Sequence, residues 1–167
     1  VNNIRKLLEV FRTKNIEVLF TVIESLTKNG RDRSLDYKIS GFNVPRGSWD
    51  AKVVDEIAPH EDEIVLPKTS SSVFISTNIQ YVLRNLGVTQ VVLVGGLTDQ
   101  CVDSAVRDAC DMGFLVTQVT DACYTFSAAR HNSSIAAIKG YCRQRTTAQI
   151  LEELAPLSPA AAWHESG

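Results

Sequence analysis

The sequence lacks the long apolar run that a membrane-spanning helix requires. Its clearest apolar stretch, residues 91–94, is far shorter than the roughly 20 residues that cross a bilayer. No basic patch followed by an apolar run opens the chain, so a signal peptide is not expected. Basic residues are scattered, 17 Lys and Arg against 19 Asp and Glu, and no positive stripe is available to neutralise nucleic-acid phosphates. We therefore expect neither a membrane nor a nucleic-acid partner.

Paired cysteines of the metal-binding kind are also absent. The four cysteines include no Cys-x-x-Cys pair, which argues against a zinc site and against a disulfide framework. They stand at Cys101, Cys110, Cys123 and Cys142. A reduced, cytoplasmic protein is the expectation, with the last three cysteines as core or strand-end residues.

What the sequence does contain is the balance of a folded domain. Apolar residues make up 44% and charged residues 22%, with 9 Gly and 5 Pro, which excludes a largely disordered chain. A chain of 167 residues is long enough to bury one hydrophobic core. We expect a single domain over residues 1–167.

Hydrophobic periodicity predicts helices and strands in alternation. A helical stripe of apolar residues opens the chain, and the continuous apolar run at 90–94 is typical of a parallel strand covered on both faces. Strands are predicted at 17–23, 63–67, 90–94 and 114–119, and helices at about 3–14, 50–57, 78–86, 102–112, 128–139 and 148–154. This order predicts an α/β fold, a three-layer sandwich with a mostly parallel central sheet flanked by helices.

Three boundaries follow from the residues between these elements. Pro67 is expected to end the second strand, because proline has no N–H to donate to a sheet. The polar segment 24–49 is expected to form a long loop of the kind that carries function. The tail from Ala155 is expected to be loosely held.

Cys101 is the strongest candidate nucleophile. Ligands of open parallel sheets bind beyond the carboxyl ends of the strands, and Cys101 follows the strand at 90–94 and directly precedes a predicted helix. Free N–H groups at a helix N-terminus favour the thiolate. The preceding glycines, Gly95 and Gly96, allow the amides of Leu97 and Cys101 to point at one developing oxyanion. The alternative is that Cys101 is a small buried apolar residue.

Two charged residues follow other predicted strands. Lys68 comes directly after the strand at 63–67, where a lysine can stabilise an anionic intermediate or a thiolate. Glu24 follows the strand at 17–23 and is a candidate substrate ligand or base. For each of them, an ordinary solvated loop residue is the alternative.

Taken together, these motifs resemble the isochorismatase-like cysteine hydrolase family. A Lys-x-x-x-Ser-x-Phe spacing runs from Lys68 through Ser72, a Thr-Asp-x-Cys-Val turn spans 98–102, and Asp-Ala-Cys follows at 121–123. The match keeps the family order over nearly the whole chain. Gly-Ser-Trp-Asp at 47–50 and the acidic pair that follows it at 55–56 further resemble the branch that includes ureidoacrylate amidohydrolases.

The resemblance implies an Asp-Lys-Cys triad without a metal or other cofactor. Cys101 would attack the carbonyl of a small amide, ureido or carbamoyl compound and form a thioester, while Lys68 would support charge and proton movements. A non-proline cis peptide between Gly96 and Leu97 would aim the Leu97 amide into the oxyanion hole. The aspartate of the family lies in an Asp-x-Gln motif on a strand before the first helix, so we expect a further strand upstream of Val1. The alternative is a truncated, inactive relative.

The remaining residue assignments concern the substrate and the metal. We assign substrate binding to Glu24, Ser72 and Tyr37, with Arg33 near them in the polar segment. Nicotinamidases of the family bind a metal through an Asp-x-His that has no counterpart at 22–25, so we expect a metal-independent enzyme. The histidines are isolated and are expected on helix surfaces or in the tail. They are His60, His131 and His164.

Two other functions remain open at the level of sequence. One is a non-catalytic family member that keeps the pocket and serves as a binding or assembly subunit. The other is vinyl-ether hydrolysis of isochorismate, which family members catalyse without a cysteine nucleophile. The resemblance also implies a homo-oligomer, a dimer or tetramer.

The expected upstream strand is open to a direct test. The intact protein isolated from its source should have a mass clearly above the 18.4 kDa of these residues, because an additional strand and its turn add mass. Mass spectrometry measures this, and a mass near 18.4 kDa would contradict the expectation.

Overall fold

Parallel strands alternate with helices along the chain, as the periodicity predicts. The structure is a computed structural model and describes residues 1–160. Its strands are β1 (Leu19–Ile23), β2 (Ile64–Lys68), β3 (Gln90–Gly96), β4 (Leu115–Tyr124) and β5 (Arg143–Arg145). Its α-helices are α1 (Asn2–Thr13), α2 (Leu35–Ser40), α3 (Val73–Ser76), α4 (Ile79–Asn85), α5 (Asp103–Asp111), α6 (Ala128–Ile138) and α7 (Thr147–Leu154). Two 3-10 turns, η1 (Trp49–Ala51) and η2 (Asp55–Ile57), and a π-helical turn, η3 (Thr98–Val102), complete the set.

The strands form two parallel sheets rather than the single sheet that was expected. β1 pairs with β2, and β3, β4 and β5 pair in that order, every pair being parallel. The two sheets nevertheless lie in one layer, because β1 contributes to the same two apolar cores as β3. Leu19 of β1 packs against the first core, which contains Val106 of α5, and Phe20 packs against the second core, which contains Val119 of β4.

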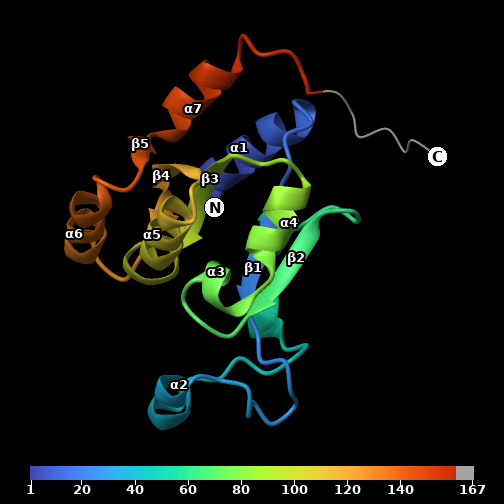
Figure 1. The fold of residues 1–167 in the computed structure, drawn as a ribbon, viewed down its shortest axis with the longest axis vertical. Helices are drawn as coiled ribbons and strands as arrows, with labels where there is room; N and C mark the ends of the chain where they lie inside the picture. The colour runs from blue at the N-terminus through green and yellow to red at the C-terminus, as the bar shows by residue number, and fades with distance from the viewer. Residues whose placement is uncertain (161–167) are drawn as a thin grey trace.

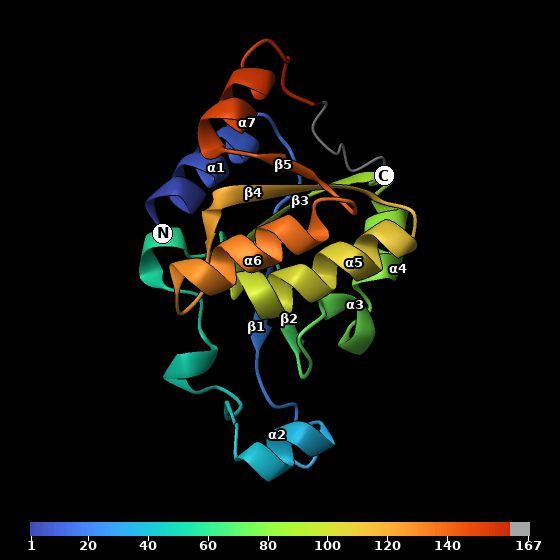
Figure 2. The same cartoon turned by 90° about the vertical axis from the view of Figure 1, so that its left-hand side faces the viewer.

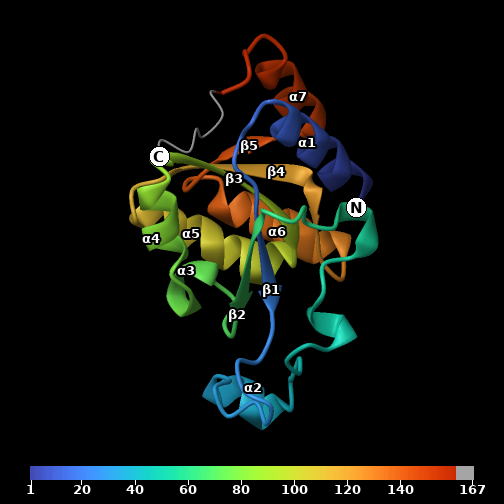
Figure 3. The same ribbon diagram turned by 90° about the vertical axis from the view of Figure 1, so that its right-hand side faces the viewer.

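Helices cover both faces of this layer, which confirms the three-layer α/β architecture. The first core joins α3, α4, α5 and α6 to the sheets, and the second core joins α1 and α7 to them. Figure 2 shows α5 and α6 side by side below β3 and β4, and α1 and α7 together above these strands. Figure 3 shows β1 and β2 from the opposite side.

Helix α1 is tied to the central layer by its apolar stripe and by an ion pair. Its apolar stripe of Ile4, Leu7 and Leu8 is buried, as a helix-period pattern requires. Arg12 near its end forms a bidentate ion pair with Glu63, with Nε–Oε1 and Nη2–Oε2 distances of 2.7 and 2.8 Å. This pair anchors the segment that enters β2.

The polar segment 24–49 contains a helix that was not predicted. Ser34 caps α2 by accepting a hydrogen bond from the Tyr37 amide at 3.1 Å, and Gly41 ends the helix in the left-handed region, at a φ of 74° where glycine is favoured. α2 buries none of its residues. Figure 1 shows it apart from the three layers.

Other boundaries also differ from the prediction. Pro67 lies inside β2, which ends at Lys68; the strand tolerates it because β2 pairs only with β1 and leaves one edge free. The single helix predicted at 50–57 is two short 3-10 turns, η1 and η2.

The chain end up to residue 160 is held more firmly than expected. Lys14 Nζ donates to the carbonyls of Ala155 and Leu157, and the Ala160 amide donates to the Lys14 carbonyl at 2.8 Å. Residues 155–160 therefore dock on the end of α1. The remainder of the predicted tail lies outside the described residues.

Burial in the core predicts a large contrast between two isoleucines. Ile138 is 0% exposed and Ile39 on α2 is 78% exposed. Replacing Ile138 by Ala should lower the free energy of unfolding by about 2–5 kcal/mol, whereas Ile39→Ala should change it by less than about 0.5 kcal/mol. Urea unfolding measures both, and equal losses would contradict the described core.

Candidate active site

The carboxyl ends of β2 and β3 bring the two leading candidate residues together. Lys68 is the last residue of β2, and Cys101 lies in the η3 turn directly after β3. Because the strands run in parallel within one layer, their carboxyl ends open onto the same edge. The Lys68 Nζ lies 3.2 Å from the Cys101 Sγ.

Lys68 is a buried ammonium that is hydrogen-bonded but has no carboxylate partner among residues 1–160. It is 3% exposed, and besides the thiol it donates to the carbonyls of Ser70 and Ser71 at 2.8 and 2.9 Å. No carboxylate among residues 1–160 forms an ion pair with it. A buried charge is costly without a counter-charge, so an anionic group that forms beside Lys68 during a reaction would be stabilised.

The turn that carries Cys101 is wider than an α-helical turn. The Leu97 carbonyl accepts hydrogen bonds from the amides of Gln100 and Val102 at 3.2 and 3.1 Å, and the second of these spans five residues, as in a π-helix. Helical structure therefore begins at Thr98, not at the predicted residue 102, and Cys101 lies within its first turn. The oxyanion hole of Leu97 and Cys101 stays a prediction.

The peptide bond between Gly96 and Leu97 is cis, as the resemblance implies. Gly96 lies directly against the ring of Tyr124, which β4 places opposite it in the sheet. A Cβ at position 96 would overlap that ring, so the close approach requires glycine. The Tyr124 ring thus packs against the backbone just before the turn that carries Cys101.

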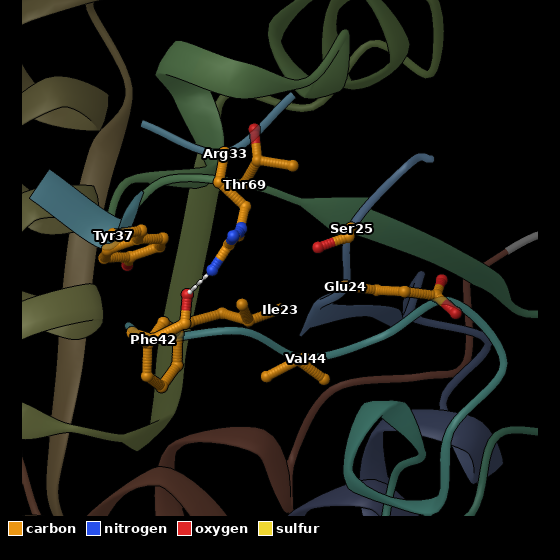
Figure 4. Close-up of a pocket in the computed structure, with 8 residues that line it drawn as sticks. All are labelled: Ile23, Glu24, Ser25, Arg33, Tyr37, Phe42, Val44 and Thr69. Carbon is orange, nitrogen blue, oxygen red and sulfur yellow. Dashed lines mark hydrogen bonds between the residues drawn. The ribbon is translucent and has the colours of Figure 1, made fainter. Parts of the chain in front are cut away.

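Two of the residues assigned to the substrate lie in a different place, together with Arg33. Glu24, Tyr37 and Arg33 line a pocket of about 10 Å³ together with Thr69, the neighbour of Lys68, which has room for about one water molecule. Figure 4 shows the Glu24 side chain running away from Tyr37 and Arg33. Cys101 does not line this pocket.

Their contacts are with the polar segment itself. The Glu24 carboxylate accepts from the Gly47 amide at 2.6 Å, Arg33 donates to the Phe42 carbonyl at 2.6 Å, and the Tyr37 ring meets Phe42 edge-on. These contacts order the segment. Substrate binding by Glu24 and Tyr37 stays a prediction.

Ser72 has a local role. Its hydroxyl accepts from the Phe74 amide at 3.2 Å and so caps α3, and it is 5% exposed. The cap fixes the loop whose carbonyls at Ser70 and Ser71 hold the Lys68 ammonium. Contact with substrate is likewise a prediction for this residue.

Sequence reasoning missed the residues that hold the cysteine turn from α6. His131, expected on a helix surface, lies with its Nδ1 at 2.9 Å from the Thr98 hydroxyl. Asp99 accepts from Thr125 and Arg130, and these hydrogen bonds, the Thr125 one foremost, lower the pKa of its carboxyl. No motif joins these residues, since their proximity arises only when α6 packs beside η3.

The positions of His60 and of the other three cysteines fit a structural role. The His60 amide donates to Glu63, and His164 lies outside the described residues. Cys110, Cys123 and Cys142 pack against the first core, as predicted. Burial raises the pKa of the Cys123 thiol to about 12 and also raises that of Cys142.

Neither a metal cluster nor a spanning helix is found in the described part of the chain. Within residues 1–160, no group of three or more His, Cys, Asp or Glu side chains is arranged to hold a metal ion. None of the helices there has the length and apolarity to cross a membrane.

The chain belongs to the isochorismatase family, whose domain matches residues 1–153. It is 38% identical over 85 residues to the ureidoacrylate amidohydrolase RutB of Agrobacterium fabrum, covering 51% of this chain and 37% of that protein. RutB of Acinetobacter baylyi is 31% identical over 105 residues, covering 62% of this chain and 43% of its own length. The chain thus matches less than half the length of these relatives.

Solved structures share the fold over more of their length. A cysteine hydrolase from Pseudomonas syringae superposes with a TM-score of 0.86 at 22% identity, covering 92% of this chain and 79% of that one. An N-carbamoylsarcosine amidase from Thermoplasma acidophilum superposes with a TM-score of 0.75 at 26% identity, covering 87% and 81%.

The site predicts an order of thiol reactivity. At neutral pH Cys101 should react with iodoacetamide before Cys123 and Cys142, because a raised pKa keeps those two thiols protonated and only the thiolate is nucleophilic. Lys68→Met should slow the labelling of Cys101 and leave that of Cys142 unchanged. Peptide mapping by mass spectrometry measures each rate. A Cys101 that labels no faster than Cys142 would contradict its role as a nucleophile.

Proposed function

We propose that this chain is a metal-independent amidohydrolase that cleaves a C–N bond of a small amide, ureido or carbamoyl compound through a thioester on Cys101. The contact between the Cys101 thiol and the buried Lys68 ammonium is the observation that carries this proposal. It is supported by family membership and by the relatives named ureidoacrylate amidohydrolase and N-carbamoylsarcosine amidase.

The reaction divides into two steps. The Cys101 thiolate attacks the substrate carbonyl and forms a C–S bond, and the C–N bond breaks as the leaving nitrogen takes a proton, for which Lys68 is the nearest donor. Water then attacks the thioester, returns a proton to Lys68 and releases the acid or carbamate. The amides of Leu97 and Cys101 are the proposed donors to the oxyanion in both steps.

A third catalytic group is part of the proposal. The Lys68 ammonium has no ion-pair partner among residues 1–160, and the two sheets of the central layer are not paired with each other. We propose that a further strand joins them and carries the aspartate of the family triad to Lys68. This aspartate would serve as the acid–base group that a proton-transfer mechanism needs.

The setting of the enzyme is likewise proposed. We infer a small-molecule substrate, a cytoplasmic location and a homo-oligomeric state, a dimer or tetramer, from the resemblance to the family. Glu24, Tyr37 and Ser72 are the proposed substrate residues. Binding at Glu24 and Tyr37 requires the segment 24–49 to shift, because the pocket that these two residues line has room for about one water molecule.

Removal of the nucleophile tests the proposal. Cys101→Ala should lower ammonia release from a small ureido acid such as ureidoacrylate by at least about a thousandfold, because no other group forms the thioester. Cys110→Ala, which changes a core-packed thiol, is the control and should retain activity. A coupled ammonia assay measures both variants.

The same variants separate the alternatives when isochorismate hydrolysis and binding of the ureido acid are measured beside ammonia release. Full activity of Cys101→Ala would refute covalent catalysis, and hydrolysis of isochorismate by that variant would point to vinyl-ether chemistry. A protein that binds the ureido acid without releasing ammonia would be the non-catalytic family member, an alternative motivated by the unpaired Lys68 among the described residues.

A further inference from the structure

The turn that carries Cys101 is fastened to one short segment of the chain, residues 125–134. Thr98, which opens the turn, is 0% exposed. Its hydroxyl lies 2.9 Å from His131 Nδ1, and its carbonyl accepts from the Ser134 hydroxyl at 3.1 Å. The same Ser134 oxygen lies 3.0 Å from an Asp103 carboxylate oxygen at the start of α5.

A second set of hydrogen bonds joins Asp99, the next residue of the turn, to the same segment. The Asp99 carboxylate accepts from Thr125 Oγ1 and from Arg130 Nε, both at 2.5 Å. The Arg130 side chain is 43% exposed and also lies over the Phe126 ring. Dissolved salt screens an exposed ion pair such as Arg130–Asp99, and water competes for its hydrogen bonds. The buried contact at Thr98 is therefore the more stable of the two.

His131, which contacts Thr98, also lines a groove that is open to solvent. It lines an open groove of about 450 Å³ between α6 and the β4, β5 and α7 region. The groove is not lined by Cys101 or Lys68. His131 therefore reaches the cysteine turn only through Thr98, and a substrate at Cys101 need not touch it.

We propose that His131 is a positioning residue: its hydrogen bond to Thr98 holds the π-helical turn so that Cys101 stays in contact with Lys68. The inference rests on the proposed function for the chemistry it serves. A π-helical turn is uncommon and often lies at a functional site, and the contacts at Thr98 hold this one from outside its own backbone. Thr98 lies next to Leu97 and three residues before Cys101, so movement of Thr98 displaces both the nucleophile and the proposed oxyanion donor.

Substitution of His131 with two readouts tests this role. His131→Leu should slow alkylation of Cys101 by iodoacetamide and lower kcat by about 10- to 100-fold, the cost of a misplacement near 1 Å. KM should change far less, since His131 is not proposed to touch substrate. His131→Asn places a polar atom close to the position of Nδ1 and should restore most of both rates.

Two further variants serve as a control and as a test of the partner residue. Asn132→Leu changes an exposed neighbour that lines the same groove and should leave both rates unchanged. Thr98→Val removes the hydroxyl with little change of shape; it should match His131→Leu, and the double variant should be no worse than either single one. Additive losses in this cycle would overturn the proposal.

The outcomes also separate this inference from the proposed function. Unchanged Cys101 alkylation in His131→Leu would overturn the positioning role. Equal losses in His131→Leu and His131→Asn, together with a lowered Tm in both, would overturn it as well, in favour of a purely structural role. Slower alkylation with rescue by Asn, in a protein that hydrolyses no small amide, ureido or carbamoyl compound, would support the positioning role and refute the hydrolase function.

Discussion

The contact between Lys68 and Cys101 depends on two parallel strands of the central layer that end at the same edge of that layer. Each residue is far from the other in sequence, and each is placed by the strand before it: Lys68 closes β2, and Cys101 follows β3 after a single turn. A buried ammonium at 3.2 Å from a thiol is costly unless a negative charge compensates it. The rest of the site, including the α3 cap and the carbonyls of Ser70 and Ser71, keeps that ammonium in place.

The cysteine turn needs support from beyond the sheet. A hydrogen bond from Val102 to Leu97 makes it a π-helical turn, and α6 holds it through Thr98 and Asp99. Gly96 lets the Tyr124 ring pack at its start. The position of the sulfur is thus determined by three elements, β2, β3 and α6, each of which contributes an apolar side chain to the core that also contains α3, α4 and α5.

The sequence predicted the parts of this arrangement that local rules control. The continuous apolar run before Gly95 indicates a parallel strand, and the ends of parallel strands meet at one edge, so Lys68 and Cys101 were expected to meet. Helix α2 was missed because it buries none of its residues and leaves no periodic core signal. His131 was missed because its partner Thr98 is brought near only by the packing of α6, which no spacing encodes.

The covalent intermediate is the central claim, and it can be observed directly. The protein, mixed with ureidoacrylate, quenched in acid within the first turnovers and digested, should carry an added acyl mass on the peptide that contains Cys101, because thioesters survive in acid. Mass spectrometry locates the adduct. Release of ammonia with an adduct on another residue, or with none at any time point, would contradict the account.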